Sequence, residues 1–300
     1  MFSPDGRRIV FTRAAFPSLS STVCVCNTDG SNLKKLVTPE DESECFLSPV
    51  WVSDSRIYYT RDPDHESPRH MEVWQVDPDG KDRQLVFRFK ERLKKDGGLV
   101  TDVSPDGRQL AVIAQQEGDW STADVYITDL KGNLLHTVWE DSPDDHADAG
   151  ALWSPNGKTI VWHHNITPGA FDRAASFGVG RASLGEDGKW TARVPRQTET
   201  FVTPVAWADD SRVLLCARIH ESRRGASPAT LLLKDAQLQP VKVLFGLPRW
   251  RRSPEPWCYG RPGDWGAVPA DALLSPPDVP GFRRPGGAAP PKGRRRPLTP

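Results

Sequence analysis

The sequence Ser104-Pro105-Asp106-Gly107, followed by the apolar run Leu110–Ile113, identifies the architecture of this chain. Proline fixes φ at the second position of a tight turn, aspartate hydrogen-bonds locally, and glycine supplies positive φ. These residues therefore predict a hairpin that joins a strand ending at Val103 to an apolar strand. The second strand is apolar at consecutive positions, as expected where both faces of a sheet are buried.

The same unit recurs five times along the 300 residues. Its turn residues are Asp5, Asp54, Asp106, Asn156 and Asp210, at spacings of 49, 52, 50 and 54. Glycine follows the turn residue at Gly6, Gly107 and Gly157, and we expect all of these turn positions to be structural. A second set of strand-then-turn segments runs in phase with the first, at 23–30, 73–80 and 125–132. Each unit of about 50 residues therefore contains four short strands.

Repeated four-stranded units whose sheets are covered on both faces predict an all-β fold, a β-propeller of antiparallel blades. We place this propeller at 1–245. The predicted blades are approximately 1–47, 48–97, 98–147, 148–202 and 203–245. The first unit begins at Phe2, so most of its innermost strand is expected to be missing.

An aromatic residue, Ser-Pro-Asp-Gly, an aliphatic triplet and then a strand ending in Asp-x-Asp-Gly together resemble the repeat of TolB-like β-propellers. The resemblance covers about residues 1–245. It implies six or more blades in an intact protein, a periplasmic location and a protein partner at the bacterial cell envelope. The repeat is also similar to the propellers of prolyl-oligopeptidase-type peptidases and of oligogalacturonate-lyase-like proteins. In family terms the chain is expected to have lost its start, together with a signal peptide.

Residues 246–300 differ in composition from the rest. They contain 13 Pro and 8 Gly, with ten Lys or Arg against four Asp or Glu. Because the whole chain has 39 residues of each sign, the first 245 residues hold 29 basic against 35 acidic ones. Such a tail is predicted to be disordered. We interpret it as the product of GC-rich DNA read out of frame; the alternative is a basic arm for nucleic acid or an anionic surface. We favour the first interpretation and therefore expect no nucleic-acid partner.

The connection lengths predict where a partner binds. Connections between strands one and two and between strands three and four are tight, whereas the other connections are long and share the opposite face. Long loops on a rigid scaffold commonly carry binding residues. The candidate binding residues on this long-loop face are His65, His70, Asp144, Asp145, His146 and Asp148. Residues 88–95 are expected to form one exposed helical turn, although a basic patch is the alternative.

Only the family resemblance suggests a metal site. Lyase-like propellers hold a divalent metal with histidines near the channel mouth, which makes His163 and His164 weak candidates, with His65, His70 and His146 beside them. The acidic loop 140–148 lacks the spacing of a calcium loop. We predict no bound metal and no cofactor.

Signals for nucleophilic or nucleotide chemistry are missing from the sequence. It contains no G-x-S-x-G elbow, and Gly178-Val179-Gly180 lacks the third glycine of a dinucleotide loop. The sequence has no apolar run of 18 residues, so it predicts no transmembrane helix. The residues after Met1 predict no secretory signal, so the alternative location is cytoplasmic. We therefore predict a non-catalytic scaffold that binds a protein or glycan; the alternatives are a metal-dependent lyase-like enzyme or the propeller part of a truncated peptidase.

Overall fold

A computed structural model describes most of the N-terminal part of the chain. The described residues are 1–14, 20–41, 44–63, 70–115, 123–140, 149–165, 177–194, 200–210, 212–219, 229–235 and 240–246. The chain divides into two units, Met1–Trp250 and Arg251–Pro300. The second unit, and with it nearly all of the tail singled out in the sequence, lies outside the described residues.

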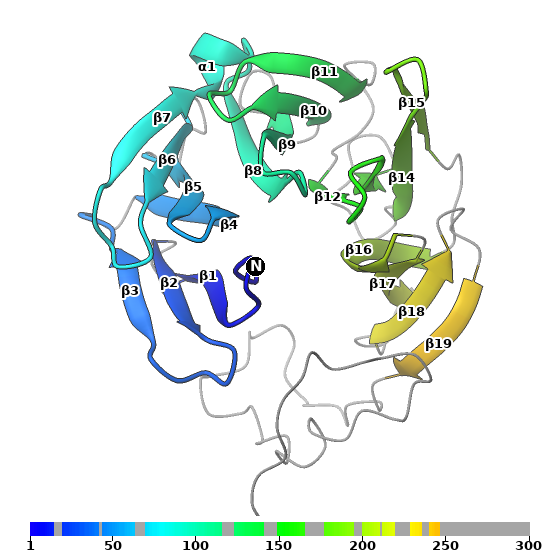
Figure 1. The fold of residues 1–300 in the computed structure, drawn as a ribbon, viewed down its shortest axis with the longest axis horizontal. Coiled ribbons are helices and arrows are strands. Elements are labelled where there is room, and N and C mark those ends of the chain that lie inside the picture. Colours follow the sequence, from blue (N-terminus) through cyan, green and yellow to red (C-terminus); the bar gives the residue numbers. More distant parts are fainter. Residues whose placement is uncertain are drawn as a thin grey trace, which may run out of the picture. The chain divides into compact units, whose positions relative to one another are not determined.

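Five antiparallel sheets follow one another in the first unit, each with its strands in chain order, as Figure 1 shows. Blade one consists of β1 (Arg8–Ala14), β2 (Ser21–Asn27) and β3 (Lys34–Val37). Blade two consists of β4 (Cys45–Ser53), β5 (Arg56–Asp62), β6 (Glu72–Val76) and β7 (Gln84–Arg88), followed by the one-turn helix α1 (Phe89–Arg92). Blade three consists of β8 (Gly97–Val103), β9 (Gln109–Gln115), β10 (Asp124–Asp129) and β11 (Leu134–Trp139).

Blade four consists of β12 (Ala149–Trp153), β13 (Thr159–Asn165), β14 (Phe177–Leu184) and β15 (Trp190–Arg193). Blade five consists of β16 (Thr200–Asp209), β17 (Arg212–Ile219), β18 (Ala229–Asp235) and β19 (Pro240–Gly246). The strands β4, β8, β12 and β16 are innermost, and consecutive ones contact each other. Repeated four-stranded sheets arranged in this way confirm the predicted β-propeller fold.

Blade one has three strands, and the residues before its first turn pair with β1 as the end of an innermost strand would. Phe2 forms an isolated antiparallel bridge with Ile9. The Val10 amide donates to the Met1 carbonyl over 2.9 Å, and the Ser3 amide donates to the Arg8 carbonyl over 2.9 Å.

The Ser-Pro-Asp-Gly turns are held by a repeated set of hydrogen bonds. The Ser104 hydroxyl donates to Asp106 Oδ1 over 2.6 Å and accepts the Gln109 amide over 2.9 Å. Asp106 Oδ1 also accepts the Arg108 amide over 3.1 Å. Gly107 adopts a φ of +70°, which an L side chain disfavours. The same bonds recur in blades one and four, around Asp5 and Asn156.

The second strands of the blades are buried on both faces, as their continuous apolar sequence predicts. In β9, every residue from Leu110 to Ala114 is at most 1% exposed. Val112 and Ala114 pack in the core shared with blade two, whereas Ala111 and Ile113 pack in the core shared with blade four. Each sheet is thus covered by its neighbours.

The helical turn expected within 88–95 is confirmed by α1, but it is not wholly exposed. Phe89 is 0% exposed and packs edge-on against Phe87, with ring centroids 5.4 Å apart. Among the described residues, no helix has the length and apolar character needed to cross a membrane.

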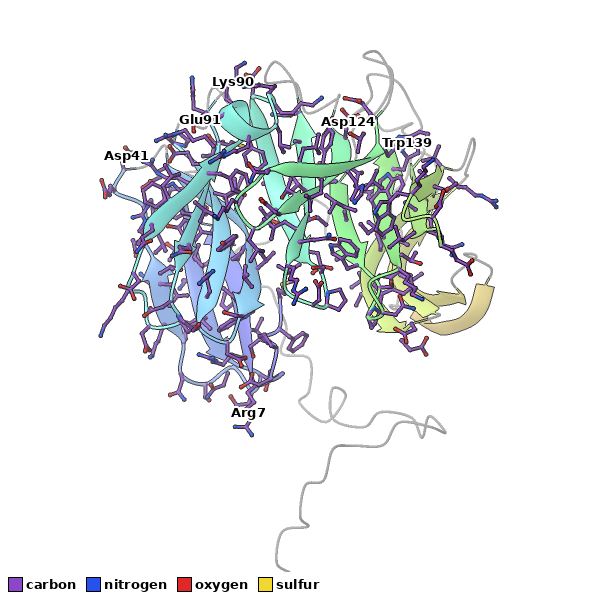
Figure 2. All side chains as sticks on the ribbon, turned by 45° about the horizontal axis from the view of Figure 1, so that its top comes forward. Arg7, Asp41, Lys90, Glu91, Asp124 and Trp139 are labelled. Atoms are coloured by element: carbon purple, nitrogen blue, oxygen red, sulfur yellow. The ribbon has the colours of Figure 1, made fainter. Side chains whose placement is uncertain are left out.

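The tight turns and the strand ends that lead into the long connections lie at opposite ends of the blades. Figure 2 shows Arg7, from the first Ser-Pro-Asp-Gly turn, at one end. At the opposite end lie labelled residues from or beside the long connections: Asp41, Lys90, Glu91, Asp124 and Trp139. We call that end the long-loop end.

Candidate functional site

Most of the loop residues singled out in the sequence lie outside the described residues, namely His65, Asp144, Asp145, His146 and Asp148. His70 is described. It is exposed and lies two residues before β6, at the long-loop end of blade two.

The two adjacent histidines at the end of β13 point to opposite faces of the sheet. His164 is buried, with its ring edge-on to Trp139 at a centroid distance of 6.0 Å. Burial, with a smaller contribution from His164, lowers the pKa of His163 to about 4. In the part of the chain that the structure describes, no three His, Cys, Asp or Glu side chains are grouped so that they could hold a metal ion.

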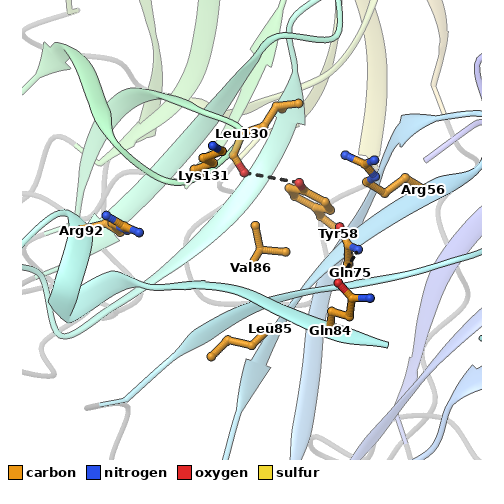
Figure 3. Close-up of a pocket in the computed structure, with 9 residues that line it drawn as sticks. All are labelled: Arg56, Tyr58, Gln75, Gln84, Leu85, Val86, Arg92, Leu130 and Lys131. Carbon is orange, nitrogen blue, oxygen red and sulfur yellow. Dashed lines mark hydrogen bonds between the residues drawn. The ribbon is translucent and has the colours of Figure 1, made fainter. Parts of the chain in front are cut away.

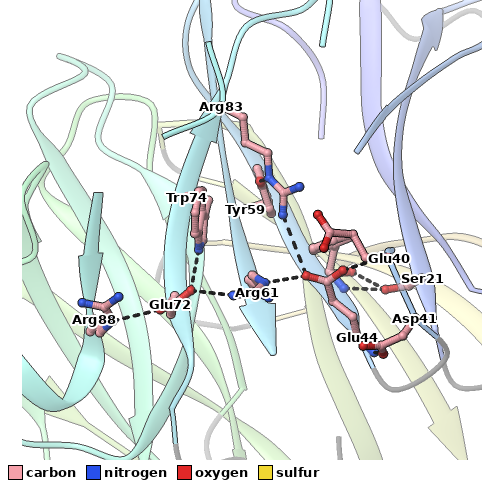
Figure 4. A network of polar contacts seen from close by, with 11 residues as sticks. Ser21, Glu40, Asp41, Glu44, Tyr59, Arg61, Glu72, Trp74, Arg83 and Arg88 are labelled. Atoms are coloured by element: carbon pink, nitrogen blue, oxygen red, sulfur yellow. Dashed lines mark hydrogen bonds and ion pairs between the residues drawn. The ribbon is translucent and has the colours of Figure 1, made fainter. Parts of the chain in front are cut away.

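The described part of the long-loop end carries a charged network that crosses all four strands of blade two (Figure 4). Glu44 precedes β4, Arg61 lies in β5, Glu72 begins β6 and Arg88 ends β7. Arg61 bonds Glu44 through Nε at 2.5 Å and Glu72 through Nη1 at 3.1 Å. Arg88 Nε bonds the other oxygen of Glu72 at 2.8 Å. We call these four residues the charge ladder.

Glu72 is the centre of the charge ladder. Its side chain is 10% exposed, and Oε2 also accepts the indole N–H of Trp74 over 2.7 Å. Burial would raise the pKa of this carboxyl, but the hydrogen bonds from Trp74, Arg88 and Arg61 outweigh it and hold the pKa below its usual value. Glu72 is therefore ionised at neutral pH, and it orients two guanidinium groups.

The Trp74 indole packs at the interface of blades one and two, and two arginines lie beside its ring. The guanidinium carbon of Arg83 is 5.1 Å from the indole centroid, and that of Arg61 is 5.8 Å away. Arg83 Nε donates to the Tyr59 hydroxyl over 2.7 Å. Burial raises the pKa of Tyr59 to about 12, so this phenol stays neutral. The aromatic ring and its cations form a fixed surface with both apolar and charged character.

Blade three repeats the arrangement with different residues. Asp124 begins β10, as Glu72 begins β6, and its Oδ2 accepts the hydroxyl of Tyr126 over 3.0 Å. Lys95 lies 3.3 Å from Asp124 and 3.4 Å from Glu140. Burial, followed by the charges of Asp124 and Glu140, raises the pKa of Tyr126. An acid and an aromatic residue two positions later therefore recur at the long-loop end of both blades.

The charge ladder was not predicted from the sequence, because its members lie between positions 44 and 88 and share no short motif. One signal was available. Glu72-x-Trp74 and Asp124-x-Tyr126 occupy the same place in the second set of repeated strands. Two acids at equivalent positions in repeats that are otherwise apolar indicate a shared polar position.

Comparisons with known proteins bear on the fold. No family model and no curated protein matches the chain. Among solved structures, TolB from Acinetobacter baumannii matches with a TM-score of 0.54 and 22% identity, over 80% of this chain and 53% of that one. A putative TolB from Agrobacterium tumefaciens matches with a TM-score of 0.56 and 13% identity, over 82% of this chain and 79% of that one.

A prolyl endopeptidase matches with a TM-score of 0.51 and 14% identity, over 82% of this chain and 34% of that one. The class of structure is thus a β-propeller. Within that class the likeness to TolB confirms the expected TolB-like fold. The chain spans about half the length of the TolB from Acinetobacter baumannii.

Proposed function

We propose that this chain is a non-catalytic β-propeller scaffold that binds a protein or glycan partner at its long-loop end. The observation that carries the proposal is the charge ladder. Its two acids are nearly buried, at 4% and 10% exposed, whereas Arg61 and Arg88 are 29% and 46% exposed. Arginines whose orientation is fixed by buried carboxylates lose little side-chain entropy on binding.

The likeness in fold to TolB supports this class of function, and the family resemblance in sequence supports a periplasmic location. The strands that lead into the long connections also end here, at the long-loop end of the blades. Together with the exposed guanidinium edges beside Trp74, they favour a partner that offers carboxylate or hydroxyl groups, which protein surfaces and acidic glycans both provide.

A photo-crosslinking experiment tests the proposed surface. A photoreactive amino acid is introduced at Asp41, at Glu91 or, as a control, at Arg7, all of which are exposed. In cells that naturally produce the protein, we expect the same crosslinked partner from Asp41 and Glu91 and none from Arg7. A partner captured from Arg7 alone would place binding at the tight-turn end of the blades and contradict the proposal.

A second arm uses the acidic loop of the sequence analysis. Reversing the charges of Asp144, Asp145 and Asp148 together is expected to leave the melting temperature nearly unchanged, because isolated loop charges contribute little to stability. It is expected to slow association with the crosslinked partner in a salt-dependent manner. Unchanged association kinetics would exclude this loop from the binding surface.

The likeness to a prolyl endopeptidase favours a second candidate function, the propeller part of a longer peptidase. The present chain would then cover about a third of the whole protein, in proportion to the 34% of the endopeptidase that it spans. Genomic sequence on both sides of the coding region distinguishes the two candidates. An adjoining hydrolase domain with a nucleophile elbow supports the peptidase; its absence in all frames supports the scaffold.

A further inference from the structure

A groove separates the outer strands of blade two from the β10–β11 turn of blade three (Figure 3). Its volume is about 440 Å³. Leu85, Val86 and Leu130 supply aliphatic surface, and the Tyr58 hydroxyl donates to the Leu130 carbonyl over 3.3 Å. The groove is separate from the charge ladder, and nothing in the proposed function uses it.

Three cations line this groove, namely Arg56, Arg92 and Lys131, and all three are exposed. Within the described part of the chain, none of the three forms an ion pair with an acid. Arg92 Nη1 donates to the neutral amide oxygen of Asn133 over 3.3 Å. The lining residues include no carboxylate.

The acid beside this groove, Asp129, accepts hydrogen bonds from residues of its own turn. Its Oδ1 accepts the backbone amides of Lys131 and Asn133 over 2.8 and 2.9 Å. Its Oδ2 accepts the Asn133 side-chain amide over 2.8 Å. These bonds, after the opposing effect of burial, hold the pKa of Asp129 below its usual value. The three cations thus line a groove whose neighbouring carboxylate, Asp129, is already hydrogen-bonded within its own turn.

The contact between blades one and two shows which residue holds the same turn position elsewhere in the chain. There, Asp79 in the β6–β7 turn bonds Lys34 at the start of β3, with 3.0 Å between Nζ and Oδ1. Asp79 immediately precedes Gly80, just as Lys131 immediately precedes Gly132. The corresponding residue is also an aspartate in blades one and four, at Asp29 and Asp187. Blade three alone among these four turns replaces the acid with a lysine.

We infer that the groove between blades two and three binds an acidic peptide segment, with ligand carboxylates paired to Arg56, Arg92 and Lys131 and an aliphatic side chain against Leu85, Val86 and Leu130. Between blades one and two the turn supplies the carboxylate of Asp79, whereas here it supplies the additional cation Lys131. Guanidinium groups bind carboxylates in a bidentate manner. The aliphatic surface between the cations favours a peptide over a small free anion.

The test measures fluorescence anisotropy of a labelled ten-residue peptide of alternating glutamate and leucine. We expect binding that weakens as salt is raised, and no binding of the matching glutamine–leucine peptide. Lys131→Asp is expected to weaken binding by about tenfold or more, because an attractive charge becomes a repulsive one. Aspartate already occupies this turn position in three other blades, so the variant is expected to fold, which circular dichroism checks.

Arg108→Glu is the matched control. Arg108 follows the first turn of blade three as Arg56 follows that of blade two, and it lies outside the groove. Its peptide affinity is expected to stay within about twofold of the parent, since the two sites do not contact.

Two outcomes would overturn the inference. In the first, a folded Lys131→Asp protein binds the glutamate–leucine peptide as tightly as the parent. In the second, millimolar inorganic phosphate displaces the peptide completely at constant ionic strength, which would make the groove a site for small anions. Because the groove lies apart from the charge ladder, neither result bears on the proposed function at the long-loop end.

Discussion

Trp162 occupies the space where a side chain at Gly180 would lie. The two residues are directly paired between β13 and β14. A Cβ atom built on Gly180 would overlap the indole ring of Trp162, which is 0% exposed in the core between blades three and four. Packing therefore explains why position 180 is a glycine, although Gly178-Val179-Gly180 does not form a dinucleotide-binding motif.

Gly180→Ala is expected to lower the free energy of unfolding by about 1–3 kcal/mol, because a buried indole must move to admit one methyl group. Urea denaturation measures the loss. In a Trp162→Leu background the smaller side chain leaves room, so the same glycine substitution is expected to cost less. Equal costs in the two backgrounds would show that the indole is not the cause.

Asp106→Ala is expected to lower stability by about 1 kcal/mol, because Asp106 Oδ1 accepts both the Ser104 hydroxyl and the Arg108 amide. Gly107→Val is expected to cost at least as much, since φ there is +70°. Asp54→Ala is the control. The blade-two turn is shorter, and no hydrogen bond to the Asp54 carboxylate is found among the described residues, so a change within about 0.5 kcal/mol is expected.

Asp102 links the innermost strands of blades three and four and makes stability depend on pH. Its Oδ2 accepts the Trp153 amide over 2.7 Å, and its Oδ1 accepts the Val103 amide over 2.8 Å. Burial raises the pKa of Asp102 to about 6, from its usual value of 3.8. The folded state therefore binds the proton more tightly than the unfolded state, and this carboxyl favours folding increasingly as pH falls from about 6 to about 4.

Asp102→Asn removes this titration. Relative to the variant, the parent is expected to gain on the order of 2 kcal/mol of unfolding free energy between pH 7 and pH 4. Burial of His163 acts in the opposite direction: its lowered pKa costs stability as pH falls from about 6.5 toward 4. Urea titrations of both proteins at several pH values isolate the Asp102 contribution. Parallel pH profiles would contradict the assignment.

Glu72→Gln is expected to lower stability at neutral pH by about 1–3 kcal/mol, because Arg61 and Arg88 both lose a charged acceptor. The lowered pKa of Glu72 means that its contribution is present above about pH 4.5 and is lost as pH falls further. The variant should therefore lose less stability on acidification than the parent.

Glu91→Gln is the matched control, because Glu91 also contacts Arg88, at 3.3 Å, but its side chain is 61% exposed. A change of less than about 0.5 kcal/mol is expected there. If both substitutions cost the same, burial would not be what makes Glu72 important.

The regular features of this fold were predictable, because each follows from a local rule that is repeated. The Ser-Pro-Asp-Gly turns specify hairpins, and the continuous apolar strand of 110–114 specifies a sheet buried on both faces. The charge ladder and the Asp102 link were not predictable, since they join residues that are 11 to 51 positions apart. Register between strands and contact between blades create such pairs, and no short motif encodes either.

The exchange of an acid for Lys131 shows how a blade can acquire a new recognition property. The turn is shaped by Asp129 and Gly132, so the charge at Lys131, which lies between them, can change without loss of the turn. In a designed variant, one substitution at this position of each turn would make the adjoining surface between blades neutral or cationic. In a repeat architecture, the neighbouring copies then serve as built-in references for each altered one.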